Sequence, residues 1–356
     1  MGRNVNRGGY AMITRHCRAM LTLALVTCVA SALVTAAAAQ ALKKITFVQM
    51  HPIMGIGEEV FLYAVPKHLG YFAAEGLEVE IQNSQTGMIS AQVLQSNNAQ
   101  VGTTAAAAIM AVREQNGDLV SFFNLKRNAG TFLVVLKDSP IQKLEDLKGK
   151  KFGISGYGSA THNAANILFQ HLNLEVNKDV ALVPTGPDAE RLGAMMAGRI
   201  DATFFTSSAS APARKNGFNE LFSVADLGVE VQGNGFATSR SYIASNRDTV
   251  KNALKGFVEA IYYVYANKKE AQKVFAKYMR TTDQEMLDDS YNGYIKWIPK
   301  KPYPTLKGIQ YMLDLLAPQM PQAKNAKPEQ FVDLSFLQEL EKEGFFNDMA
   351  KRYPTK

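Results

Sequence analysis

The chain has 356 residues, of which 47% are hydrophobic and 20% are charged, and its formal net charge at pH 7 is +7. Both cysteines, Cys17 and Cys28, and four of the 39 basic residues lie in the first 41 residues, which contain none of the 32 acidic ones. The rest of the chain therefore has no cysteine, and its 35 basic residues against 32 acidic ones leave a net charge of +3. This composition excludes a disulfide, a thiolate metal site and a cysteine nucleophile there. The even, dispersed charge argues against nucleic-acid binding.

The first 41 residues have the three-part pattern of a secretory signal peptide. Arginines precede an apolar run, Met20–Val34, and small residues then lead to the sequence Ala39-Gln40-Ala41. Because this pattern directs export, we expect cleavage before Leu42 or after Ala39, and a periplasmic location. The apolar run is shorter than the roughly 20 residues of a spanning helix, which weighs against a permanent anchor. Met12 is an alternative start, and a lipid anchor at Cys28 is disfavoured because no Gly or Ala stands directly before it.

Beyond the signal segment, short apolar strands alternate with helical stretches, which predicts an α/β fold with largely parallel sheets. The predicted strands are 45–50, 77–82, 100–104, 119–125, 132–137, 151–155, 181–184, 202–206 and 222–225. The predicted helices between them are 58–74, 89–96, 105–115, 159–171 and 189–197. From Asp248 onward only helices are predicted, at 248–266, 269–279, 283–297, 305–316 and 336–349, with prolines between the later ones.

The chain is long for a single α/β core, yet no flexible linker divides it. Two lobes joined by two chain crossovers resolve this conflict. We predict the crossovers near Lys126–Gly130 and Gly233–Ala237, where glycine stands beside a strand pattern. The predicted organisation is a signal peptide at 1–41, a first lobe at 42–127 plus 237–356 that includes the C-terminal helices, and a second lobe at 128–236.

Four stretches resemble, in the same order, segments of ABC-transporter substrate-binding proteins of the nitrate/sulfonate/taurine and thiamine-precursor family. They are HLGYFAAEGLEVEI at 68–81, QVL with AQVG at 92–102, LEDLKGKKFG at 144–153 and MAGRIDA at 196–202. The resemblance implies a two-lobed type II periplasmic-binding-protein fold with a helical C-terminal region. It also implies a monomer that captures a small molecule between its lobes and delivers it to an ABC permease in the inner membrane. One departure is Asn98-Ala99-Gln100, which replaces the family's glycine-containing turn.

Ligand contacts are expected where helices begin after strands, because ligands of α/β lobes sit at the carboxyl ends of strands. Free N–H groups and a partial positive charge at helix starts favour anions. The turn Gly156–Thr161 is one such place, and the family has ligand contacts there, although Ser159 can also act simply as a helix cap. The predicted ligand-binding residues are Met54, Thr86, Gly87, Thr104, Ala105, Lys126, Tyr157, Gly158, Ser159, Thr161 and Thr206. Their chemistry favours a small organic anion such as a sulfonate or carboxylate, or a compact polar heterocycle.

The sequence offers little for catalysis. Neither an H-E-x-x-H zinc motif nor a G-x-S-x-G nucleophile elbow occurs, so we expect no enzyme activity, no metal and no cofactor. One alternative is an enzyme on the same fold, related to fungal thiamine-pyrimidine synthesis, whose cysteine-rich iron site has no counterpart after residue 41. A second alternative is a sensory ligand-binding module that acts in trans on a membrane kinase.

Overall fold

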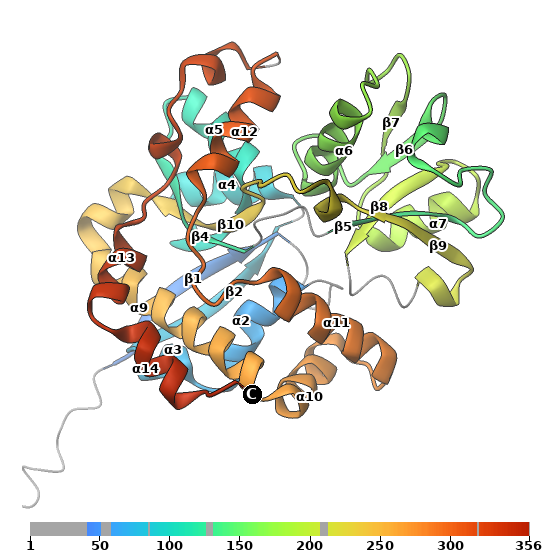
Figure 1. The fold of residues 1–356 in the computed structure, drawn as a ribbon. Helices are drawn as coiled ribbons and strands as arrows, with labels where there is room; N and C mark the ends of the chain where they lie inside the picture. The colour runs from blue at the N-terminus through green and yellow to red at the C-terminus, as the bar shows by residue number, and fades with distance from the viewer. Residues whose placement is uncertain are drawn as a thin grey trace, which may run out of the picture. The chain divides into compact units, whose positions relative to one another are not determined.

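The computed structural model describes residues 41–50, 58–84, 86–125, 131–206, 213–318 and 320–355. Within these ranges ten strands form two five-stranded sheets (Figure 1). The strands are β1 (Lys43–Gln49), β2 (Leu77–Asn83), β3 (Val101–Ala105), β4 (Leu119–Asn124), β5 (Thr131–Leu136), β6 (Lys151–Ile154), β7 (Ala181–Pro184), β8 (Ala202–Thr206), β9 (Phe218–Ser223) and β10 (Asn234–Ser239). Residues 1–40 of the predicted signal segment and the loop 51–57 lie outside the described residues.

Both sheets are mixed: in each of them four strands run in the same direction, as predicted, and one strand runs against them. The first sheet has the order β2-β1-β3-β10-β4 and the second has the order β7-β6-β8-β5-β9. In each sheet two strand pairs are parallel and two are antiparallel, and every antiparallel pair contains β10 or β5. These two strands are the first after each passage between the sheets. Because they enter from the other sheet rather than over a helix on the same sheet, they run in the opposite direction.

The helices cover both faces of each sheet and form the C-terminal region. They are α2 (Glu58–His68), α3 (Tyr71–Ala74), α4 (Gly87–Gln95), α5 (Ala106–Glu114), α6 (Ala160–His171), α7 (Asp188–Met196), α9 (Arg240–Ala266), α10 (Lys268–Met279), α11 (Gln284–Trp297), α12 (Leu306–Leu316), α13 (Ser335–Lys342) and α14 (Phe345–Arg352). Four short 3₁₀ turns, at Leu144–Leu147, Val224–Leu227, Pro321–Asn325 and Pro328–Phe331, complete the described elements. Gly70 and Gly344 adopt positive φ of 74° and 80° and break two predicted helices into pairs. None of the described helices is long and apolar enough to cross a membrane.

The strand β10 was not predicted. Its residues were assigned in part to the second crossover, and the predicted lobe boundary at 236/237 falls inside it. All six of its residues are buried, so it has no alternating pattern, and it begins with Asn-Gly. Asn-Gly is a turn signal in a sequence. Its pairing with β3 and β4 makes it a strand of the first sheet.

The first sheet is packed on both faces. On one face, Phe47 of β1, Phe236 of β10 and Phe257 of α9 form an aromatic core in which Phe236 and Phe257 lie 4.2 Å apart between ring centroids. On the other face, Val48 packs with the residues of α4, α5 and α12. The second sheet packs against α6 on one face and α7 on the other. As a result, α4, α5, α6 and α7 all start at the carboxyl ends of parallel strands, where ligand contacts were predicted.

Candidate ligand-binding site

Four of the predicted residues meet at the carboxyl edge of the first sheet. Thr86 caps α4, since its Oγ1 accepts a hydrogen bond from the N–H of Ile89 at 3.2 Å. Thr104, which is fully buried at the end of β3, donates from Oγ1 to the carbonyl of Gly87 at 2.7 Å. A Cβ atom on Gly87 would lie 3.1 Å from the backbone nitrogen of Ala105. The start of α4 is therefore locked against the start of α5 by a close approach that glycine permits.

Four more of the predicted residues form one turn on the second sheet. Ser159 caps α6 by accepting from the N–H of His162 at 3.2 Å, and its Oγ lies 3.0 Å from Oγ1 of Thr161. Thr161 is buried and accepts from the N–H of Ser155 at 2.8 Å. Gly158 has a φ of 76°, and Tyr157 is exposed. Both hydroxyls thus act within the turn, as the capping interpretation requires, and their contact with a ligand stays a prediction.

The structure does not describe the side chains of three predicted contact residues. Met54 and Lys126 lie outside the described residues, and only the backbone of Thr206 is described. Thr206 ends β8, where it pairs with Thr131 of β5.

A cavity of about 480 Å³ lies between helices of the two sheets. Its walls come from α4, α5 and α12 on one side and from α6 with its flanking turns on the other. The lining residues are Met88, Ala107, Ala111, Tyr157, Gly158, His162, Asn163, Asn166, Val176, Asn177, Leu316 and Met320. Of the predicted residues, only Tyr157 and Gly158 line it. Among the described residues in its wall, none carries a formal charge at neutral pH when His162 is neutral.

His162 and Asn163 line the cavity but were not among the predicted contacts. Nδ1 of His162 accepts a hydrogen bond from the N–H of Gly158 at 3.0 Å, so the neutral ring carries its proton on Nε2. Burial lowers the pKa of His162 and favours this neutral form. Oδ1 of Asn163 is buried without a hydrogen-bond partner. The signal for both residues is their place in the first turn of α6, directly after the predicted contact Thr161.

A second unpartnered amide lies at the carboxyl end of β1. Gln49 is 1% exposed, and neither its Oε1 nor its Nε2 has a hydrogen-bond partner. Most buried polar groups in native proteins are hydrogen-bonded, and the exceptions require an explanation such as a ligand or an ordered water. Gln49 stands at the edge where the parallel strands of the first sheet end, next to Met50, whose N–H donates to Oγ1 of Thr103 at 3.0 Å.

The second sheet holds a buried arginine that the sequence did not single out. Nη1 of Arg191 donates to Oγ of Ser155 at 2.7 Å and to the carbonyl of Gly186 at 2.6 Å, while Nη2 donates to the carbonyl of Phe204 at 3.2 Å. Nη2 also forms an ion pair with Asp188, in the first turn of α7. The guanidinium thereby joins the backbone of β8 to the turns that follow β6 and β7. The only sequence signal was the i, i+3 spacing of the acid and the base.

The described residues contain no cluster of three His, Cys, Asp or Glu side chains that could hold a metal ion.

Comparisons with known proteins agree on family and fold. The family model described as NMT1/THI5 like matches residues 59–271. YtlA of Bacillus subtilis (strain 168), which is named as a binding protein, is 23% identical over 253 residues, or 70% of this chain and 76% of YtlA. A solved structure from Bordetella bronchiseptica RB50 has a TM-score of 0.71 at 18% identity and covers 89% of this chain and 99% of its own. The alkanesulfonate-binding protein SsuA from Xanthomonas axonopodis pv. citri, bound to MOPS, has a TM-score of 0.65 at 17% identity, with coverages of 78% and 93%. The fold is the two-lobed periplasmic-binding-protein fold.

Proposed function

The chain belongs to the NMT1/THI5-like family, and from this premise we propose that it is an extracytoplasmic solute-binding protein for an ABC importer. It captures a small organic anion between its lobes, as a monomer, and delivers it to a permease. The observation that carries the proposal is the cavity walled by helices of both sheets. A solute held there touches both lobes, and its higher affinity for the closed state is sufficient to drive closure. The proposed function requires no catalytic group.

The helix starts beside the cavity supply the preference for an anionic head group. The first turns of α4 and α6 have no acidic side chain, and Met88 and His162 bring both turns to the cavity wall. Unpaired N–H groups and the helix dipole at such positions attract a sulfonate or carboxylate. The name of the Xanthomonas relative, an alkanesulfonate-binding protein, supports the sulfonate as the first choice.

The side chains that line the cavity indicate what the rest of the solute is like. Its surfaces are apolar side chains, such as Ala111 and Leu316, interrupted by the amides of Asn163, Asn166 and Asn177. Placing a charge against such a wall is costly, whereas an uncharged body with hydrogen-bonding groups fits it. A volume of about 480 Å³ lies within the range of pockets that hold drug-sized ligands. We therefore propose an anionic head with an uncharged, ring-sized body rather than a two-carbon solute.

A thermal-shift screen of the purified protein tests the proposal. The panel contains methanesulfonate, MOPS, benzenesulfonate, benzoate and a neutral pyrimidine. A ligand present at a hundred times its dissociation constant adds about 2.7 kcal/mol to the free energy of unfolding, which raises Tm by roughly 4 °C for a chain of this size. We expect ring-bearing sulfonates to give the largest shifts. The proposal is wrong if no member of a broad anion panel shifts Tm.

A further inference from the structure

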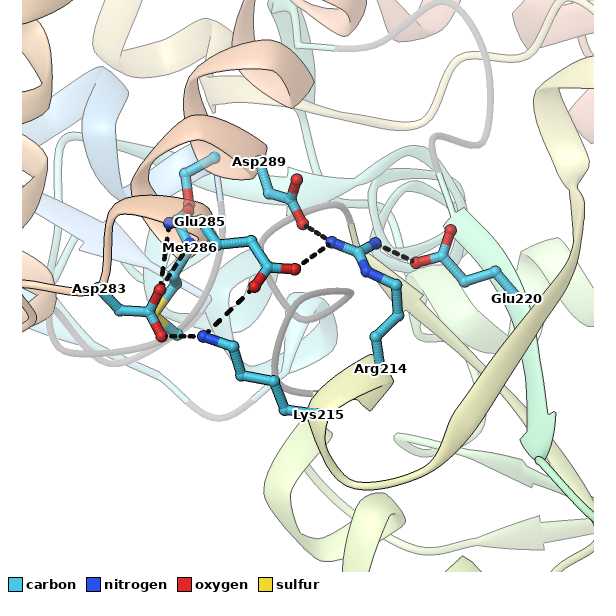
Figure 2. Close-up of polar contacts among 8 residues, drawn as sticks. Arg214, Lys215, Glu220, Asp283, Glu285, Met286 and Asp289 are labelled. Atoms are coloured by element: carbon cyan, nitrogen blue, oxygen red, sulfur yellow. Dashed lines mark hydrogen bonds and ion pairs between the residues drawn. The ribbon is translucent and has the colours of Figure 1, made fainter.

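A network of charged side chains joins the second sheet to a C-terminal helix (Figure 2). Arg214 donates from Nη2 to Glu285 at 3.2 Å and to Asp289 at 2.5 Å. Its Nη1 donates to Glu220 at 3.2 Å. Lys215 pairs with Asp283 and lies 3.4 Å from Glu285. We call Arg214, Lys215, Asp283, Glu285 and Asp289 the inter-sheet ion network.

Each side of the network is fixed to its own sheet. Arg214 and Lys215 directly follow Ala213, which is buried with Phe205 and Phe218 of the second sheet. The acids stand on α11 or at its start, and Tyr294 of this helix is buried in the core of the first sheet. Asp283 is also the N-cap of α11, where its Oδ1 accepts from the N–H groups of Glu285 and Met286 at 3.1 and 3.3 Å. Breaking the network therefore changes the contact between the sheets without removing core residues.

A second connection between the sheets is packed rather than ionic. Tyr311 and Leu315 of α12 pack against the cores of both sheets, and the hydroxyl of Tyr311 donates to Gln170 of α6 at 3.2 Å. Gly308 lies against the chain passage that leads to β10, where a Cβ atom would be 2.5 Å from the backbone nitrogen of Gln232. Because α12 and α11 belong to the apolar clusters on opposite faces of the first sheet, the two connections lie on different sides.

We propose that the inter-sheet ion network is a salt-sensitive latch on lobe closure, with the packed contact of α12 as the pivot. The inference rests on the proposed function, because its consequence is the affinity of the solute site. Packed side chains hold a fixed distance, whereas ion pairs between half-exposed groups can separate and pair with water. Exposed ion pairs are individually weak and are screened by salt. The latch therefore increases the fraction of molecules in the closed state without making closure complete. A smaller closed population weakens apparent affinity by the same factor.

The test measures the distance between the lobes without any ligand. Spin labels are placed at Lys273→Cys on α10 and Met196→Cys at the end of α7, both exposed, in a full chain carrying Cys17→Ser and Cys28→Ser. Pulsed electron resonance is recorded at about 20 mM and about 500 mM NaCl, where the Debye length falls from about 20 Å to about 4 Å. We expect high salt to shift the wild-type distribution to longer distances. Arg214→Gln with Lys215→Gln should give the longer distances at low salt and respond little to added salt.

Two further variants separate the latch from general effects of charge. The control variant Lys255→Gln with Arg352→Gln also removes one lysine and one arginine. These two pair with Glu75 and Glu259 on elements that all pack against the first sheet, so the control should leave the distances between the labels unchanged. Arg214→Glu with Asp289→Arg restores an ion pair across the sheets and should restore short distances. Unchanged distances in the Arg214/Lys215 variant, or an equal shift in the control, would overturn the latch.

Solute binding is then measured with MOPS, the compound bound by the Xanthomonas relative. If the wild type binds it, the Arg214/Lys215 variant should bind about three- to tenfold more weakly at low salt. Equal affinity of the two proteins would overturn the latch and leave the proposed function intact. Failure of the wild type to bind any anion overturns the proposed function, while the ligand-free distances still decide whether the latch exists.

Discussion

The N–H of Gly158 donates a hydrogen bond to Nδ1 of His162 at 3.0 Å, and this bond makes the imidazole part of the turn that starts α6. The ring is buried, with Tyr157 packed edge-on at 5.3 Å between ring centroids and the amide of Asn166 3.4 Å from Nε2. Protonation of the ring adds a hydrogen to Nδ1, which can then no longer accept the bond from the N–H of Gly158. Protonation of His162 should therefore open the turn.

The first prediction is a loss of stability in acid that depends on His162. Burial lowers the pKa of His162 in the folded protein, while the unfolded chain keeps a value near 6.5. As pH falls below about 6.5 the unfolded state binds the proton first, so the free energy of unfolding decreases by at most about 1.4 kcal/mol per pH unit from this group. His162→Gln should flatten that decrease between pH 7.5 and 5 in urea denaturation. Parallel pH profiles for the two proteins would contradict the assignment.

The second prediction concerns Thr104, whose hydroxyl holds the start of α4. Thr104→Val removes the 2.7 Å bond and leaves the carbonyl of Gly87 without this donor, at a cost of about 1–3 kcal/mol. Thr238 offers a matched control, because it is equally buried and donates to the carbonyl of Gln100 at 2.6 Å. We expect both variants to lower stability in urea, but only Thr104→Val to weaken MOPS binding as well. Equal affinities in the two variants would remove Thr104 from the site.

The strands that could be predicted from the sequence are those with local apolar runs. The strands β7 and β8 have the predicted bounds, and the helices after them begin within two residues of the prediction where they are described. The strand β10 could not be predicted, because a buried Asn-Gly start looks like a turn until β3 and β4 supply its partners. The antiparallel direction of β5 has the same origin, since it depends on which sheet the chain has just left.

The same distinction applies to the candidate site: features set by residues close in sequence were predictable, and features set by distant residues were not. The turns at Thr86 and Ser159 were predictable because a strand end, a glycine and a capping hydroxyl are neighbours in sequence. The cavity residues on α12 and the partners of Arg214 were not, because Arg214 is separated from Asp289 by 75 residues. Burial of Arg191 likewise depends on Phe204 of β8 and on Ser155, which directly follows β6.

The third prediction is that Arg191 contributes strongly to the free energy of unfolding, because it joins the turns at one edge of the second sheet. Arg191→Met removes a guanidinium with four protein partners and leaves Asp188 without its cation. Removal of one member of a fully buried ion pair costs about 3–5 kcal/mol; because Asp188 is 26% exposed, we expect a loss of about 2–3 kcal/mol. Arg191→Lys keeps the charge but cannot reproduce the planar fork, so it should recover only part of the loss. Urea denaturation of the three proteins checks this order, and a loss below about 1 kcal/mol in Arg191→Met would contradict it.

The last prediction compares the effect of a change at Asn163 on the free energy of unfolding with its effect on ligand affinity. Its Oδ1 is buried without a partner, so the folded protein bears a desolvation cost that a leucine of similar size would not have. Asn163→Leu should therefore leave the free energy of unfolding unchanged or raise it by up to about 1 kcal/mol. If the amide instead meets the body of the solute, the same variant should bind MOPS roughly tenfold more weakly.

Gln100 provides the contrast for this change. Its amide is already engaged, since Oε1 accepts from the N–H of Thr46 at 2.7 Å and Nε2 donates to the carbonyl of Asn97 at 3.3 Å. Gln100→Leu should lower stability by about 1 kcal/mol or more and leave MOPS affinity as it is, because Gln100 is not in the cavity wall. Unchanged or higher stability together with weaker MOPS binding in Asn163→Leu, against the opposite result in Gln100→Leu, would identify Asn163 as an amide that binds the ligand. A clear loss of stability in Asn163→Leu, with unchanged affinity, would show that its role is structural.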